Sequence, residues 1–256
     1  MPNWNTLTNK QGLIVWGGEQ STNYGIVVSS APVFDRPVKR ANVYNVQGRN
    51  GSVLFQDGSF DDVTRTYKVW IDENEQYDSG GSLVSGDLAS RIYAFSEWLY
   101  SKNGYQELTD NFEPDIFRLA YYSGGREITN ELMIYGETEI QFTCRPERFL
   151  VSGKSAEVHS SGDIITNPTK YTSKPLIHIE GSGTVTVTLG GNTMTAVLGT
   201  SDYIDIDCER MNAYKGTTLK NDKISGDFPV IKSGANTLTT TGTITKLTIT
   251  PRYFVL

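Results

Sequence analysis

Residues 46–71, VQGRNGSVLFQDGSFDDVTRTYKVWI, carry the strongest turn and strand signals of the chain. This stretch contains two turn signals, Asn50-Gly51 and Asp57-Gly58, whose residues tolerate the positive φ angles of tight turns. Each signal predicts a reversal of the chain between extended segments. The whole stretch is therefore expected to form one uninterrupted hairpin core.

The second part of this stretch, residues 63–71, predicts a strand with one buried face. Successive side chains of a strand point to opposite faces, and the apolar residues here fall on alternate positions. The expected inner face carries Val63, Tyr67, Val69 and Ile71, and the expected outer face carries Thr64, Thr66, Lys68 and Trp70.

The composition favours a mainly β protein. The chain has 256 residues, which is enough for one or two hydrophobic cores, and 25 of them are glycine. Thr and Tyr are abundant and helical periods are few, which is typical of strands joined by many turns. The net charge of −6 argues against a domain that binds nucleic acid by neutralising phosphates.

The two cysteines, Cys144 and Cys208, are too far apart in sequence for a metal-binding motif and are predicted to be buried free thiols. No apolar run approaches the length needed to cross a bilayer, and no apolar segment follows a basic stretch at the N-terminus. We therefore expect no membrane partner, and synthesis in a cytoplasm without export by a cleavable signal.

One helix is predicted, at about residues 87–102. Leu88, Ile92, Phe95 and Leu99 recur at offsets of four, three and four, which places them on one stripe for packing against a sheet. Short apolar runs at residues 13–16 and 25–28 predict the first two strands.

A domain boundary is predicted where Arg145-Pro146-Glu147-Arg148 breaks the strand pattern. Residues 1–148 are expected to form a β-rich sandwich or barrel-like domain with the helix, and residues 149–256 a β-sandwich. Gly190-Gly191-Asn192 predicts a hairpin turn in the second domain. The expected strands of that domain are residues 176–179, 184–189, 193–197, 203–208, 228–231, 237–241 and 244–249.

Motifs in a fixed order along nearly the whole chain give it a resemblance to the distal tail proteins of long-tailed bacteriophages. In the first domain they are Gly48-Arg49-Asn50-Gly51, Asp57-Gly58, the Tyr67 strand, Tyr105 with Leu108 and Asp110, and Phe-Arg-Leu-Ala-Tyr at residues 117–121. In the second they are Asn167-Pro168 and residues 173–177, 204–208 with Ala213-Tyr214, Phe228-Pro229 and 248–252.

This resemblance implies a structural hub, a hexameric ring at the distal end of the tail tube in the virion. The first domains would make the ring, and the second domains, galectin-like in the family, would point outward. The implied partners are the tail tube protein, a tail-associated fibre or lysin protein, and receptor-binding or baseplate proteins for host attachment. DNA would pass through the lumen without specific binding.

The ring interface is predicted at Trp4, Arg49, Asn50 and Asp57. The last three belong to the two exposed turns. Trp4 is a lone large aromatic in a polar N-terminal segment, where its ring would be buried best by docking on a neighbouring subunit. A frayed end is the alternative for that segment.

Asp205, Asp207 and Glu209 fall on one face of a strand, which is compatible with a metal site or an acid/base pair. One strand cannot supply a full coordination shell, so a charged outer sheet face is the preferred interpretation.

The sequence offers no other constellation for catalysis. Cys144 with His159 or His178 has no local signature of a nucleophile and its base. We therefore predict no enzyme activity, no catalytic residue, no cofactor and no metal.

The alternative function is a carbohydrate-binding module that recognises host cell-wall polysaccharide. Sugar sites of the galectin type stack a pyranose on an aromatic ring, usually that of tryptophan. All four tryptophans, Trp4, Trp16, Trp70 and Trp98, lie in the first domain, which weakens this alternative for the second.

Overall fold

The computed structural model describes residues 12–32, 36–71, 88–122, 124 and 136–256. Strands dominate these residues, together with one α-helix, which confirms the mainly β class. The chain divides into two compact units, unit 1 with Met1–Arg148 and Leu256, and unit 2 with Phe149–Val255. No helix among the described residues is long and apolar enough to cross a bilayer.

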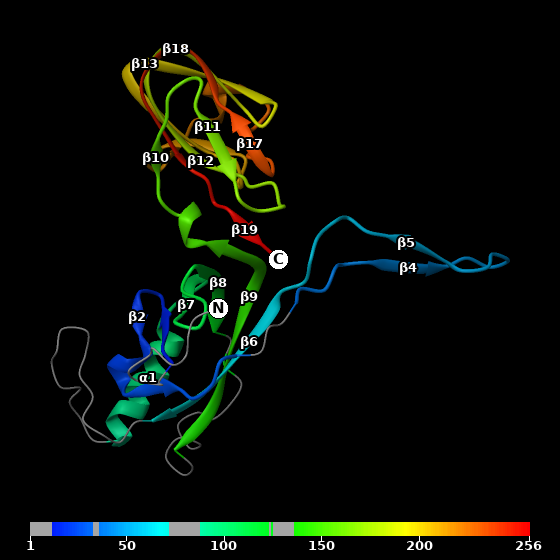
Figure 1. Ribbon diagram of the computed structural model, residues 1–256, viewed down its shortest axis with the longest axis vertical. Coiled ribbons are helices and arrows are strands. Elements are labelled where there is room, and N and C mark those ends of the chain that lie inside the picture. The colour runs from blue at the N-terminus through cyan, green and yellow to red at the C-terminus, as the bar shows by residue number, and fades with distance from the viewer. Residues whose placement is uncertain (1–11, 33–35, 72–87, 123, 125–135) are drawn as a thin grey trace. The chain divides into compact units, whose positions relative to one another are not determined.

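Unit 1 is built on a curled sheet, of which Figure 1 labels β2, β6, β7, β8 and β9. Its neighbouring strands are β2, β1, β7, β8, β9, β6 and β3 in that order. The pairings of β1 with β7 and of β6 with β3 and β9 are antiparallel. The strands are β1 (Ile14–Trp16), β2 (Glu19–Gln20), β3 (Ile26–Val28), β6 (Val63–Ile71), β7 (Gln106–Asp110), β8 (Ile116–Tyr122) and β9 (Glu137–Leu150). A short 3-10 helix, Ser21–Tyr24, follows β2.

Strand β6 has the one buried face that its alternation predicts. Tyr67, Val69 and Ile71 are buried, whereas Thr64 and Lys68 are exposed. Arg65 shares the buried face, where its guanidinium lies 3.1 Å from Asp110 and 3.0 Å from Glu113. These partners, with the Tyr67 hydroxyl that donates to Asp110 at 2.7 Å, make burial of the charge tolerable.

Helix α1 (Leu88–Ser101) packs its apolar stripe on the sheet, as predicted. Ile92, Phe95 and Leu99 are fully buried. Trp98 lies beside the stripe, with its ring stacked on Tyr24 at 5.2 Å between centroids and edge-on to Trp16 at 5.8 Å. Aromatic contacts of this kind anchor the helix to the core.

Two expectations for unit 1 are wrong. The reversal predicted at Asp57-Gly58 does not occur. Strand β5 (Ser52–Phe55) pairs with β4 (Asn42–Asn45) in a separate two-stranded sheet, and the chain after Gly58 continues in the same direction, with Phe60 opposite Lys39. Residues 46–71 are therefore not one hairpin core. Also, β9 continues through Pro146 to Leu150. Its pairing with β6 ends at Cys144, so the missing N–H of Pro146 removes no bond to β6.

Unit 2 contains a sheet with the order β10-β18-β12-β13-β14-β15, in which β16 also pairs with β13. A second ribbon pairs β11 with β17. The strands are β10 (Glu157–Val158), β11 (Ile164–Asn167), β12 (Leu176–Leu189), β13 (Asn192–Asp207), β14 (Asn212–Lys215), β15 (Thr218–Leu219), β16 (Ile224–Gly226), β17 (Gly234–Thr237), β18 (Thr239–Thr250) and β19 (Phe254–Val255).

The strands of unit 2 are longer than predicted. Residues 176–179 and 184–189 belong to the single strand β12. Where the sequence predicted a break between two strands, β12 has a bulge between Gly181 and Gly183. A Cβ at Gly181 would lie 2.2 Å from the Thr243 carbonyl oxygen, so glycine permits the close approach of β18 there. The predicted turn at Gly190-Gly191 joins β12 to β13, with both φ angles positive.

The predicted strand at residues 228–231 is wrong. This segment makes only an isolated bridge, between Ile231 and Ser173. The tail of the chain adds β19, which pairs with β9, and there the Leu150 N–H donates to the Tyr253 carbonyl at 2.8 Å.

Candidate assembly surface

The strands β4 and β5 form a ribbon that leaves the sheet of unit 1 (Figure 1). Their register pairs Asn42 with Phe55 and Asn45 with Ser52. The pairing extends toward the sheet through a bridge between Lys39 and Phe60 and through the Asp61 N–H, which donates to the Val38 carbonyl at 2.9 Å. We call residues 38–61 the arm.

The arm exposes apolar side chains on both of its faces. Val43 and Leu54 are opposite each other on one face, and Tyr44 and Phe55 lie on the other, with their rings edge-on at 5.8 Å. The exposed large apolar residues of the arm are Val38, Val43, Tyr44, Val46, Leu54 and Phe55. None of them belongs to the core of unit 1.

This arrangement is poorly suited to a free chain in water. A two-stranded ribbon alone is marginally stable, and its unpaired edges can accept further strands. A contiguous apolar surface on a water-facing element is typical of a site for another protein. The arm therefore has the chemistry of an assembly surface.

The tip of the arm is the turn that joins β4 to β5. The Arg49 N–H donates to the Val46 carbonyl at 3.2 Å, and Gly48 and Gly51 both adopt a φ of 80°. The side chains of Arg49 and Asn50 are exposed there. They offer a charge and an amide at the far end of an apolar ribbon.

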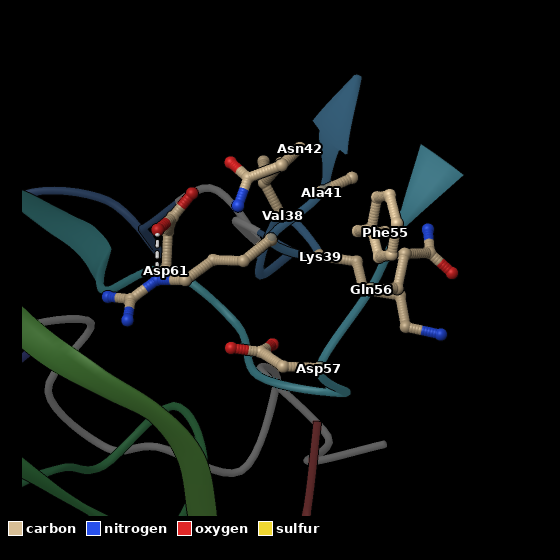
Figure 2. A pocket seen from close by; sticks show the side chains of 9 residues that line it. Val38, Lys39, Ala41, Asn42, Phe55, Gln56, Asp57 and Asp61 are labelled. Atoms are coloured by element: carbon tan, nitrogen blue, oxygen red, sulfur yellow. Dashed lines mark hydrogen bonds and ion pairs between the residues drawn. The ribbon is translucent and has the colours of Figure 1, made fainter. Parts of the chain in front are cut away.

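The base of the arm is held by local polar contacts. Asp57 accepts hydrogen bonds from the Ser59 hydroxyl at 2.6 Å and from the Ser59 N–H at 2.8 Å, and these bonds lower the pKa of Asp57. Arg40 Nε pairs with Asp61 at 2.7 Å, shown as the dashed line in Figure 2. Asp57 is thus engaged in shaping its own turn.

A hollow of about 520 Å³ opens at this base. Residues before β4 and after β5 contribute to it from both sides of the ribbon (Figure 2). Its lining is Val38, Lys39, Arg40, Ala41, Asn42, Phe55, Gln56, Asp57 and Asp61. The mixture of an aromatic ring, alkyl groups and charges suits a protein side chain or a chain segment as occupant.

The structure does not gather the four predicted interface residues at one place. Arg49 and Asn50 lie at the tip and Asp57 lies at the base, while Trp4 lies outside the described residues. Sequence reasoning missed the apolar residues between them, above all Tyr44 and Phe55. Their signal was the apolar run Val53-Leu54-Phe55 between two turns, which does not alternate as a half-buried strand does.

The prediction of three carboxylates on one outer strand face is wrong in part, because β13 ends at Asp207, Asp207 is buried, and Glu209 lies beyond the strand, 3.7 Å from Arg252. Asp205 lies 2.7 Å from His178 Nδ1. Asp207 receives Arg252 at 2.7 Å and also the N–H groups of Glu209 and Arg210. Within the described residues, no group of three or more His, Cys, Asp or Glu side chains is arranged to hold a metal ion.

Cys144 is buried, with its thiol 3.9 Å from the Phe142 carbonyl. Burial raises the pKa of this thiol to about 11, which disfavours the thiolate that a nucleophile needs. Cys208 is buried too, and burial raises its pKa to about 12.

Comparison with known proteins shows that part of the chain matches a family of phage tail domains and that the fold is similar to that of a solved phage tail protein. Residues 21–144 match the family described as the phage tail protein RIFT-related domain. The crystal structure of the Dit protein gp 19.1 of phage SPP1, described as a paradigm of the hub adsorption apparatus in phages that infect Gram-positive hosts, is similar to this chain. The TM-score is 0.68 at 14% sequence identity, over 96% of this chain and 99% of that one. No curated protein sequence matches the chain.

Proposed function

We propose that this chain, whose residues 21–144 match the phage tail protein RIFT-related domain and whose fold is that of a distal tail protein, assembles into a hexameric ring hub. The resemblance to distal tail proteins read from the sequence is confirmed. The hub would sit at the distal end of the tail tube in the virion and connect the tube to the parts of the tail tip.

The arm is the observation that carries this proposal. It presents apolar side chains on both faces, outside the core of its own unit. A ribbon that is apolar on both faces is stabilised when a neighbour covers it, because each buried large apolar side chain contributes about 1.5–3 kcal/mol. The occupant we propose is a second copy of unit 1.

A closed ring uses such an arm on every subunit. In a head-to-tail interface the arm of one copy meets a different surface of the next copy, and rotation closes the series. Closure also hides strand edges that would otherwise aggregate. Arg49 and Asn50 at the tip would then contact the neighbour, and Asp57 would hold the base of the arm.

The remaining contacts of the hub follow the family expectation. We propose the tail tube protein on one side of the ring, a tail-associated fibre or lysin protein on the other, and receptor-binding or baseplate proteins at the periphery. Unit 2, for which we keep the galectin-like expectation, would supply the peripheral docking sites. DNA would pass through the lumen without specific binding.

Light scattering after size exclusion, followed by negative-stain imaging, tests the ring. We expect a mass six times that of the chain and ring-shaped particles. Tyr44→Ser and Phe55→Ser should each shift the protein toward monomers, because each removes an apolar side chain that the neighbour covers. Arg49→Glu should weaken assembly by placing the opposite charge at the tip.

The matched control is Tyr93→Ser on the outer face of helix α1. Tyr93 and Tyr44 are equally exposed, at 57% and 56%, so the two changes remove the same side chain from two surfaces of unit 1. Tyr93→Ser should leave the rings intact. A protein that stays monomeric at all concentrations, or rings that survive every change in the arm, would contradict the proposal.

A further inference from the structure

Strand β13 of unit 2 has a gap in its pairing along one edge. Residues 205–207 pair with β14, and residues 194–196 pair with β16. In the described part of the chain, no strand pairs with residues 197–204 on this edge. The polypeptide between β14 and β16 bridges the gap with β15 and a short 3-10 turn, Asn221–Lys223.

A bulge shapes the strand inside this gap. Opposite β12, the register shifts between Leu198 and Asp202, and Ser201 adopts a φ of 50°, which is costly for a residue other than glycine. Asp202 fixes the bulge by accepting the N–H groups of Tyr203 at 2.8 Å and Gly199 at 3.2 Å. Bulges commonly re-aim side chains at binding sites.

A hollow of about 330 Å³ opens at the bulge, near the lower end of the volumes of small-molecule sites. It is lined by Val197, Leu198, Gly199, Asp202, Tyr203, Ile204, Lys215, Lys220 and Lys223. Three lysines and one aspartate give this lining a formal charge of +2, although the whole chain carries −6. The hollow is therefore cationic on an acidic protein.

The lysines are held in different ways. Lys215 donates to Asp202 and lies over the ring of Tyr203, 5.0 Å from its centroid. In the part of the chain that the structure describes, the carboxylate that pairs with Lys223 is that of the exposed Asp222, at 3.3 Å. Among the described residues, no carboxylate pairs with the half-buried Lys220. Its charge is available to a ligand.

The turn that presents these lysines is fixed by Asn221. Its side-chain oxygen accepts the Ala213 N–H at 2.7 Å, and its amide donates to Asn212 at 2.9 Å. The backbone N–H of Lys220 also donates to the Ala213 carbonyl, at 2.7 Å. Because these bonds already order the backbone, it loses less conformational entropy when a ligand binds.

We propose that this hollow binds an acidic sugar, a pyranose that carries a phosphate or a carboxylate. Lys220 and Lys223 would bind the anionic group, while the exposed side chain of Val197 and the edge of the half-buried Tyr203 ring would contact the sugar ring. A long nucleic acid fits less well, because the surrounding acidic protein would repel its phosphates beyond the hollow. The site belongs to unit 2 alone and does not depend on the ring.

NMR titration of the full chain in about 50 mM salt tests the site, since low salt preserves attraction between exposed charges. The probes are glucose 1-phosphate, glucuronate, neutral glucose and a short single-stranded oligonucleotide. We expect saturable shifts of residues 197–204 and 215–223 with either acidic sugar, and at least tenfold weaker binding of glucose. Whichever acidic sugar binds more tightly identifies the anionic group.

The double variant Lys220→Ala/Lys223→Ala should weaken binding of the acidic sugar at least tenfold. The control is the double variant Lys170→Ala/Lys232→Ala, which removes the same charge from exposed lysines of unit 2 outside the hollow and should bind as the natural chain does. Absence of saturable binding, equal binding of glucose, equal losses in the two variants, or tighter binding of the oligonucleotide would each overturn the proposal.

Discussion

At the residue scale, Asp207 shows how a group that looks available in sequence becomes part of the framework. It is buried, and burial alone would raise its pKa, but hydrogen bonds from Arg252 and from the backbone N–H groups of Arg210 and Glu209 outweigh burial and lower the pKa. The carboxylate is therefore charged and fully engaged. Asp207 could be placed on its strand from sequence, but its partner Arg252 is 45 residues away.

Arg252→Met should lower the free energy of unfolding of unit 2 by about 2–3 kcal/mol at pH 7, because it leaves a buried carboxylate without its cation. The native pKa of Asp207 lies below the ordinary 3.8. The stabilisation is thus fully present above about pH 4 and is lost as the pH falls through the native pKa. Urea unfolding at pH 7 and pH 2.5 measures both values.

Arg210→Met is the control for that prediction. Arg210 also lies 3.9 Å from Asp207, but its side chain is 81% exposed, so its loss should have little effect. Equal effects of the two variants, or a difference from the natural chain that does not shrink at low pH, would contradict the assigned role of Arg252.

At the scale of elements, helix α1 was predictable and the arm was not. The stripe of Ile92, Phe95 and Leu99 follows from the helical period alone. The arm has two strong turn signals, and only the first reverses the chain. Residues on both sides of Asp57-Gly58 pair with the same opposite segment, residues 38–45, so the reversal predicted there is wrong. Asp57 instead makes a local bond to the Ser59 N–H, because the chemistry that favours a turn also suits an irregularity within a ribbon.

Trp98→Ala should destabilise unit 1 by about 3–5 kcal/mol, because it leaves a cavity between Trp16, Tyr24 and Phe95. Tyr93→Ala on the exposed face of the same helix should change the free energy of unfolding by less than about 0.5 kcal/mol. Urea unfolding followed by circular dichroism compares the two. A Trp98 variant as stable as the Tyr93 variant would show that the helix does not anchor the core.

At the scale of the whole molecule, each unit has its own core. The buried cluster of unit 2 runs from Ile165 to Tyr253 and that of unit 1 from Ile14 to Cys144. Strand β9 passes through the predicted boundary without a break. The predicted boundary therefore lies close to the division between the two units. Pro146 suggested that the strand ends there, although β9 crosses the division.

A fragment of residues 149–256 should fold by itself, because the long strands β12, β13 and β18 pair with one another inside unit 2. We expect a cooperative thermal transition and a dispersed NMR spectrum like that of unit 2 in the full chain. A fragment without a cooperative transition would show that unit 2 needs unit 1 to fold.

Features that depend on neighbours along the chain follow from the amino-acid sequence alone. These are the buried face of β6, the stripe of α1, the Gly190-Gly191 hairpin and the mainly β class. Tertiary structure decided which strands pair, that β5 leaves the core, and that Lys220 and Lys223 meet the bulge of β13. The physical reason is that local periodicity fixes the face a side chain takes, whereas partners such as Val63 and Cys144 are chosen by the packing of the entire sheet.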